Sequence, residues 1–231
     1  MRAAWMIAVN FLRESRWPIL LLMLWAAASG VIAALTVGGM SDDALFFLKQ
    51  QAAYCIFFIV FLAASALQNQ RRSRRLLAVL SKGIERREYL AGIVLGFLTV
   101  AAMYSAVLGI TGAWTFSIAG ANPGTMLTVV VMLFLSSALA GTVALFFSTF
   151  MNPLLTLICS GVVLGTSAIL PGRYFSMVPV YAMMQEVLEL SFNRGVRPLW
   201  TAMGLALVET VILWLAASWI FARRDVAVSV E

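Results

Sequence analysis

The sequence predicts an all-α integral membrane protein with six transmembrane helices. Of its 231 residues, 62% are hydrophobic and only 11% are charged, whereas soluble domains average about 45–50% apolar and about 25% charged residues. The chain therefore has too little polar surface to cover a soluble globule. Two long stretches, 51–67 and 89–148, contain no charged residue, and a spanning helix needs about 20 mostly apolar residues.

Six apolar segments, bounded by turn-forming residues, are predicted to cross the membrane. They cover residues 17–37, 48–67, 89–118, 125–150, 153–170 and 199–222. The first segment exceeds the about 7–15 apolar residues of a secretory signal peptide, so we expect it to be a retained anchor. We expect residues 1–231 to form a single transmembrane domain.

The distribution of basic residues predicts the orientation of these spans. Cytoplasmic loops of membrane proteins carry an excess of Lys and Arg. With the N-terminus inside, the cytoplasmic segments hold 12 of the 16 Lys and Arg residues. The outer segments hold Lys49, Arg173, Arg194 and Arg197. Both termini are therefore expected in the cytoplasm.

The first sixteen residues predict a short amphipathic helix ahead of the first span. At 100° per residue, one side holds Trp5, Ala8, Val9 and Leu12, and the other holds Arg2, Asn10, Arg13 and Glu14. Such a helix is typical of a segment that lies in the membrane interface. The alternative is a cytoplasmic extension of the first span.

Two connecting segments are not ordinary loops. Residues 68–88 hold seven of the sixteen Lys and Arg residues, followed by an apolar patch of Leu76, Leu77, Val79 and Leu80. This patch needs cover from lipid head groups or from a partner protein, and it predicts a short helix. Residues 171–198 are too polar for a span yet rich in large apolar side chains. They predict one or two short helices that dip into the outer leaflet and cap the bundle.

The run Arg71–Gly92 carries a resemblance to a known family. It contains a basic stretch, a Leu-x-x-Leu-Ser element at Leu77–Ser81 and an Arg-x-Glu-Tyr element at Arg86–Tyr89. This loop, and the order of the segments around it, resembles the permease subunit of an ABC-2 type exporter. One difference is Gly83, which stands where family members often have a proline.

The resemblance implies a fold, partners and a function. It implies six spans, the interfacial N-terminal helix, a coupling helix between spans two and three, and re-entrant outer helices between spans five and six. It implies a bacterial cytoplasmic (inner) membrane location and pairing with a second copy or a homologous permease. Two separate ATPase subunits would bind ATP and Mg and drive export. The residues implied to contact the ATPase are Arg74, Arg75, Leu76, Leu77, Leu80, Lys82 and Glu85.

The composition argues against an enzyme. The chain contains no histidine, which excludes Ser-His triads and histidine-based zinc or bis-histidine haem sites. It has no P-loop motif, so it cannot hydrolyse ATP by that route. We therefore expect no catalytic residue, no metal and no cofactor. We also expect no nucleic-acid partner, because attraction to anionic lipid explains the net charge of +6. The alternative function is a membrane anchor or assembly protein without transport activity.

A few residues inside the spans invite separate hypotheses. Glu209 is the only acidic residue well inside a span. It either lines a substrate path or is a neutral carboxyl hydrogen-bonded to a neighbouring helix. The glycine pairs Gly161/Gly165 and Gly92/Gly96 have the G-x-x-x-G spacing that permits close helix approach. Gly161 and Gly165 are candidates for dimer packing, with packing inside one subunit as the alternative. Cys55 and Cys159 are expected to be unpaired.

Overall fold

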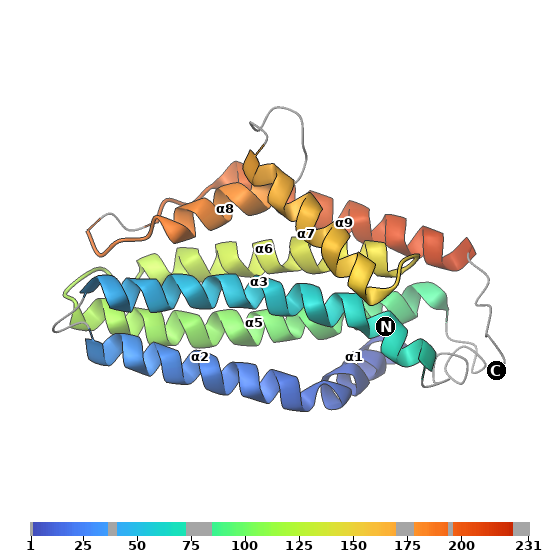
Figure 1. Ribbon diagram of the computed structural model, residues 1–231, viewed down its shortest axis with the longest axis horizontal. Helices are drawn as coiled ribbons and strands as arrows, with labels where there is room; N and C mark the ends of the chain where they lie inside the picture. Colours follow the sequence, from blue (N-terminus) through green and yellow to red (C-terminus); the bar gives the residue numbers. More distant parts are fainter. Residues whose placement is uncertain (1, 37–40, 73–84, 170–177, 194–195, 224–231) are drawn as a thin grey trace.

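A computed structural model of the chain describes residues 2–36, 41–72, 85–169, 178–193 and 196–223. Within these ranges all regular structure is helical, which confirms the predicted all-α class. The helices are α1 (Arg2–Glu14), α2 (Arg16–Thr36), α3 (Ser41–Arg72), α5 (Arg86–Ile118), α6 (Thr125–Ser148), α7 (Pro153–Ile169), α8 (Val178–Leu188) and α9 (Trp200–Arg223) (Figure 1).

Five of these helices are long and apolar enough to cross a membrane. They are α2, the part of α3 over Asp43–Leu67, α5, α6 and α9. The predicted span 153–170 corresponds to α7, which has 17 residues and a length of about 25 Å at 1.5 Å per residue. This is shorter than a hydrocarbon core of about 30 Å. The described helices therefore indicate a multi-pass membrane protein, with five helices long and apolar enough to be spans.

The second span begins earlier than predicted. Ser41 rather than residue 48 is its first helical residue, and the helix continues to Arg72. Ala44, Leu45 and Leu48 are buried at helical spacing in the additional turns. The nearby Lys49 does not interrupt them, because a lysine can lay its aliphatic stem along apolar surface. The polar composition that set the predicted boundary therefore does not end the helix.

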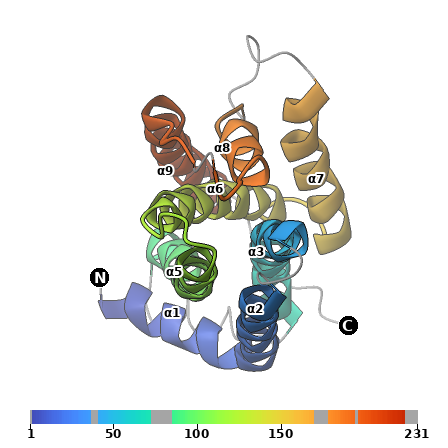
Figure 2. The same ribbon diagram turned by 90° about the vertical axis from the view of Figure 1, so that its left-hand side faces the viewer.

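The core of the bundle lies around α6. In the view of Figure 2, α3 and α5 lie on one side of α6, with α1 and α2 beyond them, and α8 and α9 lie on the other side, while α7 flanks the bundle on the right. In the most apolar window of each helix, 78% of α6 is buried but only 22% of α9. The outer helices thus leave much apolar surface exposed, as lipid-facing helices do.

Several helix ends gather at one end of the bundle. Figure 1 shows that α3 ends, α5 begins, and α6 and α9 end at the end where α1 lies. We call this the basic end, because Arg13, Arg86, Arg87 and Arg223 belong to helix termini there. The opposite end, which we call the far end, holds the connection between α5 and α6.

The first helix lies across α5 instead of extending α2 (Figure 2). Its buried residues are Ala4, Ile7, Ala8 and Phe11. They face Gly92 and Gly96, where an added Cβ would lie 2.6 Å from the Ile7 Cβ and 2.5 Å from the Phe11 Cδ1. Of the predicted apolar side, Ala8 is buried and Trp5 is 60% exposed. The two glycines of α5 give α1 a close contact within the protein, and its position in the membrane interface stays a prediction.

The segment between α7 and α9 contains one helix in its described part, α8. Val180 and Met183 of α8 are buried in a cluster with Met132, Leu135 and Leu139 of α6. The chain then reaches the far end, where the Phe192 ring lies 4.9 Å from the Phe116 ring near the end of α5. Residues 171–177, which belong to the predicted outer helices, lie outside the described residues.

Candidate functional site

The first turn of α5 is joined to the last turn of α9 at the basic end. The Arg86 Nη1 donates hydrogen bonds to the main-chain oxygens of Phe221, at 3.2 Å, and Ala222, at 3.1 Å. The last carbonyls of a helix lack partners within the helix, and a cation suits the negative end of the helix dipole. The buried rings of Tyr89 and Phe221 also stack, with centroids 6.3 Å apart. We call this contact the α5–α9 junction.

Most of the residues implied to contact an ATPase fall outside the described residues. These are Arg74, Arg75, Leu76, Leu77, Leu80 and Lys82. Glu85 is described: it directly precedes α5 in an extended conformation, and its side chain makes no capping hydrogen bond. Its carbonyl oxygen accepts a hydrogen bond from the Tyr89 amide at 3.0 Å. The exposed Glu85 carboxylate therefore lies where the basic loop enters α5.

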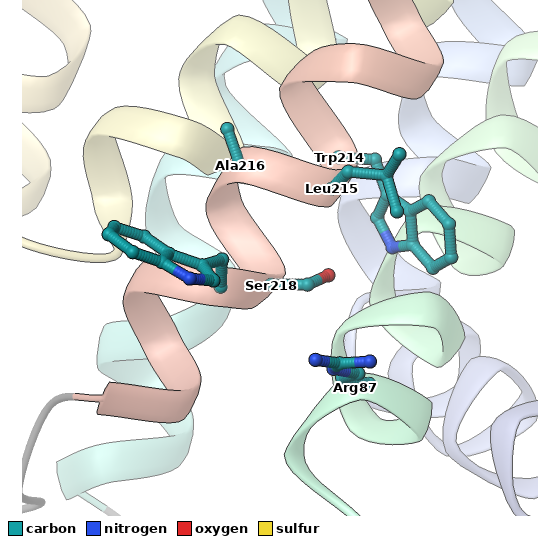
Figure 3. A pocket seen from close by; sticks show the side chains of 6 residues that line it. Arg87, Trp214, Leu215, Ala216 and Ser218 are labelled. Atoms are coloured by element: carbon teal, nitrogen blue, oxygen red, sulfur yellow. The ribbon is translucent and has the colours of Figure 1, made fainter.

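A cleft of about 550 Å³ opens beside the α5–α9 junction. It is lined by Arg87 of α5 and by Trp214, Leu215, Ala216, Ser218 and Trp219 of α9. Figure 3 shows the Arg87 guanidinium, the Ser218 hydroxyl and the Trp214 indole nitrogen facing a common space. The Ser218 Oγ and the Trp214 Nε1 are buried, and neither has a hydrogen-bond partner among the described residues.

Sequence reasoning missed this cleft. Beside the cleft, the Arg223 guanidinium carbon lies 3.9 Å from the Trp219 ring centroid. Trp214, Ser218 and Trp219 follow each other at spacings of four and one, so a helix presents them close together. The partner Arg87 comes from a helix far away in the sequence, and no local pattern signals that contact.

Glu209 is not among the described residues that line this cleft. It is nine residues before Ser218, or about 14 Å along the helix axis. Its side chain is half-buried, and its Oε2 has no hydrogen-bond partner within the described ranges. Both hypotheses for Glu209, a substrate-path residue and a neutral carboxyl hydrogen-bonded to a neighbouring helix, stay predictions.

A second polar group that the sequence did not reveal lies inside the bundle. The Tyr104 hydroxyl of α5 donates a hydrogen bond to the Gln51 main-chain oxygen of α3 at 3.0 Å and contacts the Gln51 side-chain oxygen. One turn along α3, the Cys55 Sγ lies 3.4 Å from the Ser137 Oγ of α6. All four side chains are buried. These contacts tie together the three central helices α3, α5 and α6.

The two glycine pairs have different surroundings. Gly92 and Gly96 pack against α1, within one subunit. At Gly161 and Gly165 an added Cβ would meet no atom of the described residues within 4 Å, so the alternative of packing inside one subunit has no support at this pair. Cys55 and Cys159 form no disulfide.

The site residues described above make contacts between helices and line a cleft. In the described part of the chain, no group of three or more Cys, Asp or Glu side chains could hold a metal ion. No protein-family model matches the chain, and no curated protein matches it either. The fold is that of a multi-pass α-helical membrane protein.

Proposed function

We propose that this chain is the transmembrane subunit of an ATP-driven exporter of the ABC-2 type. The observation that carries the proposal is the α5–α9 junction. The basic loop leads into α5 at Glu85, and the next residue, Arg86, is bonded to the end of α9. A protein that pushes on this loop would therefore move two candidate spans at once.

The mechanism in this proposal is mechanical. ATP binding and hydrolysis take place on a partner ATPase, which moves the loop 68–88 and with it the first turn of α5. Arg86 and Tyr89 transmit this movement to α9. Gly92 and Gly96 hold α1 against the same part of α5. The helices α1, α5 and α9 therefore respond together at the basic end, while this chain supplies no catalytic group.

We include six crossings in the proposal, with α7 and α8 together making one of them. α7 begins at the basic end (Figure 1), and Phe192, shortly after α8, contacts Phe116 near the far end of α5. This supports a complete crossing between residues 153 and 192. Both termini then lie on the side of the basic end, which the excess of Lys and Arg assigns to the cytoplasm.

The remaining site residues also have places in this proposal. Gly161 and Gly165 lie on an exposed face of α7, which suits close packing against a second permease copy. Glu209 has a buried oxygen with no hydrogen-bond partner among the described residues, which suits contact with substrate or with a polar group that appears when the helices move.

The first test is affinity purification of the tagged chain from native membranes in mild detergent, followed by mass spectrometry. Recovery of an equimolar P-loop ATPase would support the exporter proposal. Recovery of the chain alone, or with partners that lack a P-loop, would contradict it. That second result would favour the alternative, a membrane anchor or assembly protein.

A triple variant sharpens this test. We expect replacement of Leu76, Leu77 and Leu80 by Asp to abolish co-purification of the ATPase while the chain still inserts into the membrane. Met6→Asp is the control, because Met6 is an exposed apolar residue of α1 outside the implied contact. Normal ATPase recovery with the triple variant would refute the assigned coupling role.

A further inference from the structure

We propose that the cleft between Arg87 and α9 binds the phosphate head group of an anionic membrane lipid. The cleft holds about 550 Å³, room for a head group and the first part of its acyl chains. The proposal concerns a lipid that stays bound to the protein. It does not rest on the exporter function, and no ATPase is needed to test it.

The polar atoms that face the cleft are suited to an anion. Arg87 supplies a guanidinium, which carries only donors, and the indole Nε1 of Trp214 is also a donor only. The Ser218 hydroxyl can donate as well. Trp214 Nε1 and Ser218 Oγ are buried without a partner in the described part of the chain, and buried polar atoms normally have one. An ionised phosphate offers only acceptor oxygens, so its chemistry is complementary to these three donors.

Among the described residues, no acidic side chain lines the cleft to oppose this charge. Ser218 is only 3% exposed, yet Figure 3 shows its oxygen directed to the space that Trp214 and Arg87 also face. Arg87 makes no hydrogen bond or ion pair with another described residue. Its charge is therefore available to a ligand, unlike that of its neighbour Arg86, which is bonded to α9.

The level of the cleft along α9 matches that of lipid head groups. α9 has 24 residues and is therefore about 36 Å long. A bilayer has a hydrocarbon core of about 30 Å, or about 40–45 Å with its head groups. Ser218 lies five residues before Arg223, so it is within about 8 Å of the helix end. The Trp219–Arg223 pair at the same level is typical of a membrane interface.

An apolar stripe favours a lipid over a free phosphate ion. Leu215 lines the cleft and is exposed, and the exposed stripe continues toward the middle of α9 through Val208, Val211 and Ile212. Residues at these spacings share one side of a helix. An acyl chain attached to a phosphate in the cleft can lie along this stripe, whereas an inorganic anion would gain nothing from it.

Native mass spectrometry of the detergent-purified full chain tests the proposal. The protein is titrated with dioleoylphosphatidylglycerol and, separately, with dioleoylphosphatidylcholine. We expect the first phosphatidylglycerol to bind about tenfold more tightly than the first phosphatidylcholine, because only the former carries net charge to pair with Arg87. Equal binding of the two lipids would overturn the proposal.

Three variants locate the site. We expect Arg87→Gln to lower the affinity for the first phosphatidylglycerol about tenfold, because it removes a charged hydrogen bond. Ser218→Ala and Trp214→Phe should each lower this affinity about threefold, because each removes a neutral hydrogen bond. Arg13→Gln is the matched control, because it removes an exposed charge of the basic end outside the cleft. It should change the affinity by less than about twofold.

Two results would refute this assignment. Equal losses of phosphatidylglycerol affinity in Arg87→Gln and Arg13→Gln would mean that lipid binding depends only on the overall charge of the basic end. Displacement of phosphatidylglycerol by inorganic phosphate at comparable concentration would mean that the cleft selects a free anion. Ser218→Ala removes a single oxygen, so it reports on the cleft even where a larger substitution would disturb folding.

Discussion

Arg86 and Arg87 are adjacent arginines with different roles. Arg86 is half-buried and bonded to two carbonyl oxygens at the end of α9, whereas Arg87 is exposed and lines the cleft. On a helix, consecutive side chains point about 100° apart, so neighbours in a basic run meet different surroundings. Charge count alone therefore describes the orientation of the chain but not what each arginine does.

Loss of the Arg86 side chain should loosen the α5–α9 junction. We expect Arg86→Gln to lower the free energy of unfolding in detergent by about 1 kcal/mol, below the about 1.5–3 kcal/mol of a charged hydrogen bond, because the site is partly exposed. Thermal unfolding measures the loss, and hydrogen exchange should show faster exchange in the last turn of α9. Arg86→Lys should restore only part of it, since a lysine cannot copy the planar guanidinium.

The control for this variant is Arg13→Gln, which removes an exposed charge with no hydrogen bond to α9. It should leave the exchange rate at the end of α9 unchanged. Equal exchange in Arg86→Gln and wild-type protein would show that the Tyr89–Phe221 stacking alone holds the two helices together.

The buried contact between Tyr104 and Gln51 makes a second prediction. Tyr104→Phe removes the hydroxyl that donates to Gln51, so we expect a loss of about 0.6–2 kcal/mol, the range of hydrogen bonds between membrane helices. Titration with a denaturing detergent measures it. Tyr54→Phe is the matched control, because the Tyr54 hydroxyl accepts its hydrogen bond from Gln50 on the same exposed helix face.

A double variant, Gln51→Leu with Tyr104→Phe, measures how much of the stability loss comes from the hydrogen bond between the two residues. The combined loss should be smaller than the sum of the single losses, because each single change already breaks the same hydrogen bond. Additive losses would mean that the two residues act independently.

These residue contacts could be predicted only in part. The sequence marks Glu209 as an unusual acid in a span and marks residues 71–87 as basic. It does not reveal that Arg86 bonds to a carbonyl 135 residues away, or that Tyr104 meets Gln51 across 53 residues. A pattern along one helix defines a face of that helix, whereas the partner of the face depends on how the helices assemble.

At the scale of elements, α1 shows the same limit. Its amphipathic pattern is equally suited to a lipid surface and to another helix. In the structure Ala4, Ile7, Ala8 and Phe11 pack inward, while Trp5 and Met6 are exposed. The decisive signal is on α5, where Gly92 and Gly96 leave room for α1. The spacing of these glycines was visible in the sequence, but their partner helix was not.

Adding a methyl group at Gly92 should displace α1. A Cβ there would lie 2.6 Å from the Ile7 Cβ and 2.7 Å from the Ala4 main-chain oxygen, so backbone as well as side chain would have to move. We expect Gly92→Ala to destabilise the protein by about 1–3 kcal/mol, as overpacking usually does. Limited proteolysis should detect α1 by faster cleavage after Arg13, and thermal unfolding should measure the energy.

Gly204→Ala is the matched control, since an added Cβ at Gly204 in α9 would meet no described atom within 4 Å. It should be neutral or slightly stabilising, because alanine favours a helix over glycine by about 1 kcal/mol. If Gly92→Ala were as stable as Gly204→Ala, α1 would not pack closely against α5 at Gly92, and the assigned contact would be refuted.

At the scale of the whole molecule, the passage from α6 to α9 decides the topology. Composition predicted one span at 153–170, but α7 is short, and α8 continues beside α6 toward the far end. Hydropathy averages over a window, so it cannot distinguish one long helix from two shorter helices that share a crossing. The ends of the spans predicted at 17–37, 89–118, 125–150 and 199–222 lie within three residues of the helix ends, because turn-forming residues bound these segments. The second span is the exception, since its helix extends beyond both predicted ends.

Cysteine labelling in intact cells tests this topology. In a background with Cys55→Ala and Cys159→Ala, single cysteines replace Asn122 and Asn193, which follow α5 and α8, or Glu85 and Asn152, which precede α5 and α7. All four positions are exposed. We expect a membrane-impermeant maleimide to label positions 122 and 193 in intact cells, and positions 85 and 152 only after permeabilisation.

The reason is that the Phe116–Phe192 contact holds position 193 near the end of α5, whereas the basic end carries the charges that stay inside. Two other labelling patterns would contradict this topology in different ways. Labelling of position 193 together with 85 and 152 would mean that α7 and α8 do not cross, leaving five spans and the chain ends on opposite sides. Exchange of all four labels would keep the six crossings but reverse the orientation, which would place the basic loop where no ATP-driven partner could reach it.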